Sequence, residues 1–291
     1  MDYVNVYANA KINLALDILG KREDGYHELR TIMQTISLRD RLTIRKLYTN
    51  QIKLNSNVKW LPQDERNLAF SAAKILLDKF KPDYGVLIDI DKQIPISAGL
   101  GGGSADAAAT LLGVKRLFNL PISMPELMEI GKSLGADVPF CLLKGTALCE
   151  GIGEIMTPLK PCPDTHIVIA KPPISISTAD AFRQFRQDNV TTRPNIDQMI
   201  RDIENGDIKA IGKGLANVLE SVTAKEFVVI ERIKRIMLMN GSLGAIMSGS
   251  GPTVFGLFED KGEAYKARFQ IRQELSIKDV FLAGIFTPKA G

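Results

Sequence analysis

Four glycines stand where an alternating, strand-like run at 86–90 gives way to an alanine-rich helical pattern. They are Gly99, Gly101, Gly102 and Gly103. Because glycine has no Cβ atom and reaches positive φ, successive backbone N–H groups can converge on an anion at the N-terminal end of the following helix. Ser104 can add a hydroxyl group toward a phosphate oxygen or a bound Mg²⁺. The spacing predicts a phosphate-binding turn or, as the alternative, a turn that lets the helix pack close to the strand.

Several other chemistries do not fit the sequence. No Gly-Lys-Ser/Thr ends the turn as in a P-loop, and Ser104 occupies the place of the last glycine in a GxGxxG dinucleotide-binding turn. The two histidines, His27 and His166, have no partner at metal-ligand spacing, which argues against a zinc site. The sequence also has no GxSxG elbow, which disfavours a serine hydrolase.

Three other places carry residue types that could do chemistry. Lys11 lies in an apolar, strand-like segment, where most lysines extend their ammonium group to solvent. Asp137 follows a helix-like segment, where an aspartate is usually a cap or turn residue. Tyr26 and His27 lie in a polar turn at 20–28, which fits a simple hairpin loop. Each residue taken alone therefore also has a purely structural explanation.

The elements that must position these residues alternate between strand and helix patterns. We expect strands at 4–8, 12–18, 30–37, 40–46 and 52–54, the last three in an antiparallel sheet, and helices at 67–80, 104–118 and 125–135. Two strands within 145–157 are followed by a proline-rich break at 158–163, which predicts separate domains at 1–160 and 161–291. Beyond the break we expect a strand at 166–170, a helix starting near 178, helices at 196–204, 208–219 and 225–239, a strand, turn and strand at 245–258, a helix at 260–274 and a strand at 280–286.

Composition and charge are those of an ordinary globular protein. Of the 291 residues, 45% are hydrophobic and 24% are charged, and 37 basic against 33 acidic residues give a formal charge of +4. This small excess argues against nucleic acid as a partner. The sequence opens on no secretory signal pattern, and no apolar run approaches the roughly 18 residues of a membrane span. The cysteines Cys141, Cys149 and Cys162 lack CxxC spacing, so we expect reduced thiols in the cytoplasm.

Four short motifs along nearly the whole chain resemble those of the GHMP kinases, named after galactokinase, homoserine kinase, mevalonate kinase and phosphomevalonate kinase. In chain order they are Ala10-Lys11-Ile12-Asn13, the glycine turn, Leu134-Gly135-Ala136-Asp137-Val138-Pro139 and Ser248-Gly249-Ser250-Gly251-Pro252-Thr253. Within the glycine turn, the residues that match are Pro95, Gly99, Leu100, Gly101, Ser104 and Ala105. One extra glycine before Ser104 departs from the general pattern and is similar to one branch of the family.

The resemblance implies a kinase that uses ATP and Mg²⁺. It implies that Lys11 and Asp137 are catalytic residues that share the active site, and it assigns no residue as a metal ligand. The residues implied to hold ATP are Pro95, Ile96, Ser97, Ala98, Gly99, Leu100, Gly101, Gly102, Gly103, Ser104 and Ala105. The last motif implies a glycine turn that supports the phosphate loop and the substrate, made of Gly249, Ser250 and Gly251.

The Gly25-Tyr26-His27 turn resembles the substrate loop of the family branch that phosphorylates the 2-hydroxyl of 4-diphosphocytidyl-2-C-methyl-D-erythritol, in the non-mevalonate route to isopentenyl diphosphate. A cytosine needs a stacking face and a partner for its polar edge, which an aromatic ring and an imidazole supply. The substrate-binding residues that the resemblance implies are Asn13, Tyr26, His27, Asp137, Thr178 and Phe182.

The implied fold is α+β, with an N-terminal β-α-β nucleotide-binding domain and a C-terminal ferredoxin-like domain. We expect a cytoplasmic monomer or homodimer that binds a small-molecule substrate, with neither nucleic acid nor membrane as a partner. Three alternatives stay open: a sister kinase acting on homoserine or a mevalonate derivative, a decarboxylase like diphosphomevalonate decarboxylase, and a non-catalytic nucleotide-binding module. A sister kinase should lack both the Tyr26-His27 pair and the lengthened glycine turn. The presence of Lys11 and Asp137 argues against an inactive module.

Overall fold

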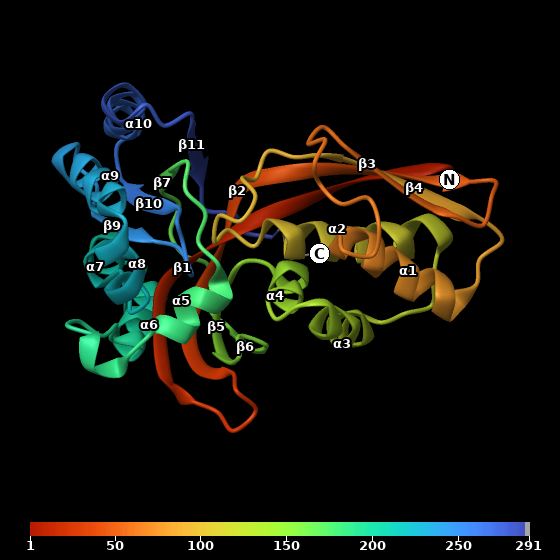
Figure 1. Ribbon diagram of the computed structural model, residues 1–291, viewed down its shortest axis with the longest axis horizontal. Helices are drawn as coiled ribbons and strands as arrows, with labels where there is room; N and C mark the ends of the chain where they lie inside the picture. Colours follow the sequence, from red (N-terminus) through yellow and green to blue (C-terminus); the bar gives the residue numbers. More distant parts are fainter. Residues whose placement is uncertain (289–291) are drawn as a thin grey trace. The chain divides into compact units, whose positions relative to one another are not determined.

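The structure is a computed structural model that describes residues 1–288. Helices and strands are mixed along the chain, so the fold is α+β as predicted (Figure 1). The chain packs into two compact units. The first unit comprises Met1–Ala10, Arg39–Ile96 and Gly101–Leu143, and the second comprises Lys11–Leu38, Ser97–Leu100 and the chain from Lys144 onward. Each unit is defined by packing and combines separate stretches of the chain. The units therefore do not test the domain boundary that we predict at residue 160, which stays a prediction.

Four strands of the larger sheet lie in the order β3-β4-β2-β1. They are β1 (Tyr3–Lys21), β2 (His27–Leu47), β3 (Ile52–Ser56) and β4 (Gly85–Asp91), and both β1 and β2 continue from the first unit into the second. β4 pairs antiparallel with β2, but β3 pairs parallel with β4. The antiparallel pairing predicted for 52–54 is therefore wrong. Helix α1 (Leu68–Phe80) lies in the connection between β3 and β4, and such a crossover returns the chain in the same direction.

β1 and β2 are single long strands, where the sequence predicts two short strands in each place. Residues 8–18 of β1 and 31–36 of β2 are buried without interruption. The alternation of apolar and polar residues, which marks a strand with one solvated face, is lost in these stretches. In the sequence, this change of pattern inside one continuous strand therefore looks like the end of one strand and the start of another.

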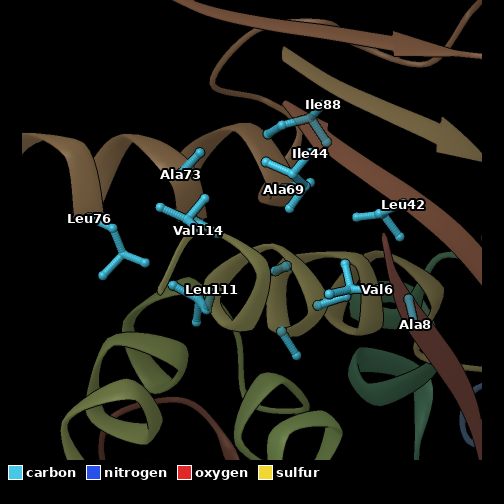
Figure 2. Close-up of a cluster of buried hydrophobic side chains, with 14 of the residues drawn as sticks. Val6, Ala8, Leu42, Ile44, Ala69, Ala73, Leu76, Ile88, Leu111 and Val114 are labelled. Atoms are coloured by element: carbon cyan, nitrogen blue, oxygen red, sulfur yellow. The ribbon is translucent and has the colours of Figure 1, made fainter. Parts of the chain in front are cut away.

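Helices α1 and α2 (Gly102–Phe118) pack against each other in the first unit, and Figure 1 shows them lying side by side. Figure 2 shows the core beside them, where Val6 and Ile44 of the sheet meet Ala69 of α1 and Val114 of α2. A Cβ atom at Gly113 would overlap the end of the Ile44 side chain, so this glycine lets α2 approach the sheet closely. The small residues of α1 and α2 allow the same close packing.

The helices predicted in the first unit are present with their expected ends. Asn67 caps α1, and Ser123 caps α3 (Met124–Leu134), in which Pro125 occupies the first turn. A short helix, α4 (Val138–Leu143), follows directly after Asp137 and was not predicted. Six apolar residues in a row carry no helical periodicity that would separate α4 from a buried strand.

The second unit contains a four-stranded antiparallel sheet in the order β11-β7-β10-β9. The strands are β7 (His166–Lys171), β9 (Gly244–Met247), β10 (Val254–Phe258) and β11 (Asp279–Gly284), and α9 (Val228–Met239) and α10 (Lys261–Leu275) pack against them. In chain order this is β-α-β-β-α-β, with the last strand beside the first. That arrangement is the ferredoxin-like topology predicted for the C-terminal part.

The second unit contains further elements. They are β5 (Thr146–Gly151), β6 (Ile155–Pro158), α5 (Thr178–Gln184), a 3₁₀ turn (Gln187–Asn189), α6 (Ile196–Asn205), α7 (Ile208–Gly214), β8 (Ala216–Asn217) and α8 (Glu220–Glu226). Of these, β5, β6 and β8 belong to the larger sheet: β5 pairs with β2, β6 with β5 and β8 with β1. Within residues 1–288, no helix has the length and apolar character needed to cross a bilayer.

The helix predicted at 208–219 is shorter than expected because Asn217 draws the chain out of helical geometry. α7 ends at Gly214, and β8 then pairs with β1 at Ala15 and Leu16. The Asn217 side-chain amide donates hydrogen bonds to the carbonyl oxygens of Met247 and Gly249, both at 2.8 Å. Tertiary hydrogen bonds of this kind override helical propensity, which sequence patterns cannot show.

Candidate active site

Lys11 is buried in the middle of β1, with 5% of its surface exposed. Its ammonium group donates a hydrogen bond to Asn13 Oδ1 at 2.8 Å. Its backbone N–H donates to the carbonyl oxygen of Leu100 at 3.0 Å, which ties the strand to the second-unit part of the glycine turn, residues 97–100. A solvent-directed lysine is therefore ruled out. A buried ammonium group that is hydrogen-bonded in this way is a candidate for binding an anion.

The turn at Ser248–Gly251 lies against Lys11 and Asn13 in the second unit. Ser248 Oγ donates to the carbonyl oxygen of Gly99 at 3.0 Å and accepts the Asn13 backbone N–H at 3.4 Å. Gly249 has a φ of 58°, and a Cβ atom there would lie 3.7 Å from Lys11 Nζ. The structure thus brings together the first motif, the last motif and part of the glycine turn.

Asn217 holds this turn from the other side and did not stand out in the sequence. Its amide donates to the carbonyl oxygen of Gly249, and its own Oδ1 accepts the Leu219 backbone N–H at 3.0 Å. Asn217 lies more than 200 residues after Lys11 in the chain and belongs to no motif. A polar residue in the middle of a helical pattern was the one available signal.

The glycine turn itself has the backbone shape that the sequence predicts. Gly99 and Gly101 have φ values of 74° and 66°, in the region that favours glycine. Gly101 is the N-cap of α2 and no side chain caps this helix, so its first-turn N–H groups point outward at an end that carries partial positive charge. This 17-residue helix with an uncapped N-terminus suits a phosphate group.

Asp137 and Ser104 belong to the first unit, where their motifs are neighbours. A Cβ atom at Gly135 would lie 3.9 Å from Ser104 Oγ, so the backbone before Asp137 runs beside the first turn of α2. Asp137 is partly exposed, and its carbonyl oxygen accepts the Cys141 N–H at 3.1 Å at the start of α4. Lys11 and Asp137 belong to different units, and their joint role stays a prediction.

A buried ionic cluster beside the start of α2 was missed from the sequence. Lys92 Nζ donates to Asp40 Oδ2 at 2.5 Å and to Asp106 Oδ2 at 2.8 Å. Asp40 Oδ1 also accepts the backbone N–H groups of Gln93 and Ile94, at 2.6 and 2.8 Å. The cluster therefore fixes the chain that enters the glycine turn. Its members lie far apart in sequence and match no motif, so no local pattern could reveal it.

Burial and the charges of the neighbouring groups shift the pKa values of Asp106 and Lys92 in this cluster. Burial raises the pKa of Asp106 to about 7, and Lys92 offsets this only in part. Burial alone would lower the pKa of Lys92, but the carboxylates of Asp106 and Asp40 outweigh it and raise that pKa. Asp106 Oδ1 has no hydrogen-bond partner among residues 1–288. Near neutral pH, the Asp106 carboxyl group can therefore hold a proton.

His27 lies among aromatic rings in the second unit. Its ring centroid is 5.4 Å from that of Phe182 and 6.5 Å from that of Phe185, the latter edge-on. Burial and, to a smaller degree, the charge of Lys21 lower the pKa of His27, so its imidazole is neutral at physiological pH. Tyr26 is 62% exposed beside it. The sequence predicted His27 and Phe182 for one site but missed Phe185, which a helical spacing of three residues from Phe182 could have suggested.

Thr178 connects the aromatic group to the Ser248–Gly251 turn. Its hydroxyl group is hydrogen-bonded to Ser250 Oγ at 2.8 Å, and it begins α5, the helix that also carries Phe182. Ser177 caps that helix through the Asp180 backbone N–H, as the sequence predicts. Helix α5 of the second unit therefore connects Phe182, one of the residues predicted to bind the base, to the turn beside Lys11.

A magnesium site made by protein side chains alone is not found in residues 1–288. No group of three or more His, Cys, Asp and Glu side chains there is arranged to hold a metal ion. Mg²⁺ commonly takes one or two protein ligands, keeps several waters and binds substrate phosphates for the rest. The hydroxyl group of Ser104, in the uncapped first turn of α2, fits that sparse mode of binding.

Comparison with known families agrees with this geometry. Residues 67–145 match the family model "GHMP kinases N terminal domain", and residues 199–277 match "GHMP kinases C terminal". The chain belongs to the GHMP kinase family, and is thus a phosphotransferase that uses ATP and acts on a small molecule.

The most similar relatives include 4-diphosphocytidyl-2-C-methyl-D-erythritol kinase of Lachnoclostridium phytofermentans, which is 47% identical over 289 residues and covers 99% of each chain. A crystal structure of a 4-(cytidine 5'-diphospho)-2C-methyl-D-erythritol kinase superposes with a TM-score of 0.84 at 30% identity, covering 98% of this chain and 100% of that one. Homoserine kinase from Cytophaga hutchinsonii has a TM-score of 0.78 at 20% identity, with 98% and 95% covered, and shares the fold. The predicted family and two-domain architecture are confirmed.

Proposed function

We propose that the protein transfers the γ-phosphoryl group of ATP to the 2-hydroxyl of 4-diphosphocytidyl-2-C-methyl-D-erythritol, giving the 2-phosphate and ADP. The observation that carries this proposal is the 47% identity, over 99% of both chains, to a kinase that is named after this substrate. The Tyr26-His27 pair, the nearby Phe182 and the lengthened glycine turn support it over a sister kinase acting on homoserine or mevalonate.

The cytidyl end of the substrate is proposed to bind at Tyr26, His27, Thr178 and Phe182. A neutral imidazole has one N–H donor and one acceptor nitrogen, and so can pair with a polar edge that offers both kinds of group. The Phe182 ring lies within contact of His27 and offers an apolar face for stacking. Asn13 and Asp137 are proposed to bind the methylerythritol part.

The phosphates of ATP are proposed to bind at residues 95–105, where the uncapped end of α2 offers backbone N–H groups. The turn of Gly249, Ser250 and Gly251 supports that loop through the Ser248 hydrogen bond to Gly99. Ser104 would hold Mg²⁺ together with the nucleotide phosphates. When bound, the ion supplies positive charge that neutralises the phosphate oxygens during transfer.

Asp137 is proposed to accept the proton of the attacking hydroxyl group. A carboxylate is a weak base toward an alcohol, so this transfer contributes once the oxygen has begun to bond to phosphorus and its proton has become acidic. Lys11 is proposed to stabilise negative charge on the hydroxyl oxygen or the phosphoryl group. General base catalysis of this kind is worth roughly 10² to 10⁴ in rate. We also propose that the enzyme works in the cytoplasm, as a monomer or homodimer, without nucleic acid or membrane.

The direct test is ATP consumption by the purified protein with Mg²⁺, using 4-diphosphocytidyl-2-C-methyl-D-erythritol, homoserine and mevalonate as separate acceptors. We expect turnover on the cytidyl compound alone, and a loss of about 10²-fold or more in kcat for Asp137→Asn. Turnover on homoserine or mevalonate instead would make the protein a sister kinase. ATP binding without any turnover would make it a binding module.

A further inference from the structure

Lys11 stands at the end of a buried chain of hydrogen bonds that runs from β1 to β2. Lys11 Nζ donates to Asn13 Oδ1 at 2.8 Å, Asn13 Nδ2 donates to Thr31 Oγ1 at 2.9 Å, and Thr31 Oγ1 donates to the Ala15 carbonyl oxygen at 2.6 Å. The exposed fractions of Lys11, Asn13 and Thr31 are 5%, 1% and 0%. All four residues belong to the second unit.

Each link of this chain has only one permitted direction. A backbone carbonyl oxygen can only accept, so the single hydroxyl proton of Thr31 is committed to Ala15. Thr31 Oγ1 can then only accept from Asn13, which turns the amide NH₂ toward Thr31 and the amide oxygen toward Lys11. A flipped amide would set its NH₂ group against an ammonium group that cannot accept, and its oxygen against a hydroxyl group without a free proton.

Thr31 therefore fixes the orientation of the Asn13 amide, whose oxygen accepts a hydrogen bond from Lys11. Its position depends on β2, where it pairs with Cys149 of β5 in a regular antiparallel register. The anchor of the chain is thus part of a sheet, which holds side chains more rigidly than a loop does. A flexible lysine side chain needs such an anchor, because its four-carbon stem has many rotamers.

We propose that Thr31 is a positioning residue for phosphoryl transfer, acting through Asn13 on the orientation of the Lys11 ammonium group. This proposal rests on the proposed function for its kinetic consequence. A misdirected ammonium group keeps its charge but loses alignment with charge that develops in the transition state, so kcat falls more than KM rises. If Thr31 had only a structural role, its substitution would change stability without lowering kcat more than it raises KM.

The first test is steady-state kinetics of the full chain with ATP, Mg²⁺ and 4-diphosphocytidyl-2-C-methyl-D-erythritol. We expect Thr31→Val to lower kcat roughly 10- to 100-fold, as loss of an outer-shell partner does elsewhere, with both KM values changed less than about threefold. Thr31→Ser keeps the hydroxyl group and should restore kcat to within about threefold of wild type.

Thr35→Val is the matched control. Thr35 lies on the same strand with 2% of its surface exposed, and its hydroxyl group has no hydrogen-bond partner in the part of the chain that the structure describes. Both variants replace a buried threonine by valine on the same strand. They differ in that only Thr31→Val breaks the hydrogen-bond chain. The proposal is overturned if Thr31→Val loses no more kcat than Thr35→Val, or if Thr31→Ser is as impaired as Thr31→Val.

A second readout needs no substrate and so separates this proposal from the proposed function. In ¹⁵N spectra of protein labelled at lysine Nζ, the Lys11 resonance, assigned by its absence in Lys11→Met, should be sharp in wild type, Thr31→Ser and Thr35→Val. It should be broadened or shifted in Thr31→Val alone. If that pattern appears in a protein without turnover, the positioning role stands and the proposed function fails. An unchanged Lys11 resonance in Thr31→Val overturns the positioning role whatever the activity.

Discussion

At the scale of single residues, the chemistry of the candidate site depends on polar groups that lie partly or wholly inside the protein. Lys11 is a cation held inside the protein by a directional hydrogen bond, and His27 is an imidazole that burial keeps neutral. Burial makes such groups more effective than their exposed counterparts, since electrostatic interactions are weaker in water. The same burial makes Lys11 sensitive to the loss of a hydrogen-bond partner, whereas His27 is sensitive to pH.

The lowered pKa of His27 predicts how substrate binding depends on pH. Because its pKa is lowered, the His27 imidazole stays neutral and keeps an acceptor nitrogen to a lower pH than an ordinary histidine does. Protonation converts that nitrogen to a donor. KM for the cytidyl substrate should therefore stay constant from about pH 8 to about pH 6.5 and rise at lower pH. His27→Gln, which keeps a donor and an acceptor, should remove the rise. Initial-rate kinetics across this range would contradict the role of His27 if both proteins showed the same rise.

At the scale of elements, the Lys92 cluster joins the chain that enters the glycine turn to the start of α2. Asp40 binds the backbone of Gln93 and Ile94 before the turn, while Asp106 holds α2 through Lys92. A Cβ atom at Gly102 would lie 3.0 Å from Ile94 and 3.4 Å from Lys92 Nζ, so the start of α2 fits tightly against this cluster. The chain before the turn and the helix after it are therefore fixed by buried contacts within the first unit.

Gly99→Ala tests the shape of this turn. A Cβ atom at Gly99 would overlap the carbonyl oxygen of Ser248, and the φ of 74° adds strain of roughly 1–3 kcal/mol. We expect ATP affinity, measured by calorimetry, to fall at least about tenfold. In Gly103→Ala the nearest atom would be Leu68 Cδ1 at 3.8 Å, so the loss should be much smaller. Equal losses in the two variants would show that backbone shape at Gly99 is not what binds ATP.

The raised pKa of Asp106 predicts a pH dependence of stability. Between about pH 4 and 7 the native protein holds a proton at Asp106 that the unfolded chain has released, so the free energy of unfolding should fall as pH rises through this window. Asp106→Asn cannot titrate, and its stability relative to wild type should increase over the same window. Urea unfolding of both proteins at several pH values measures this difference. A difference that does not change with pH would place the pKa of Asp106 near its ordinary value.

At the scale of the whole molecule, the family and the α+β fold follow from the sequence because the four motifs have local signatures. Gly99 and Gly101 need positive φ, Ser123 caps a helix together with Glu126, and the alanines of α2 mark a closely packed helix. Such features depend on a few neighbouring residues and can be recognised in one sequence.

What the sequence could not provide are the partners that meet across long separations. Thr31 lies 18 residues from Asn13, Asp40 lies 52 residues from Lys92, and Asn217 reaches Gly249 across 32 residues. Each of these residues would be unremarkable in a strand or helix by composition alone. The parallel pairing of β3 and the unbroken β1 were likewise decided by tertiary packing, which periodicity does not record.

The most direct test of the central claim is ³¹P NMR of the reaction product formed from ATP and 4-diphosphocytidyl-2-C-methyl-D-erythritol. Carbon 2 of the methylerythritol part carries a methyl group and no hydrogen, so a phosphate on its oxygen has no proton on the attached carbon to couple with. We predict a new phosphomonoester resonance that is a singlet, formed together with ADP and formed about 10²-fold or more slowly with Asp137→Asn. A doublet or triplet would place the phosphate on another hydroxyl group, and no new ester resonance despite ATP binding would contradict the proposed kinase.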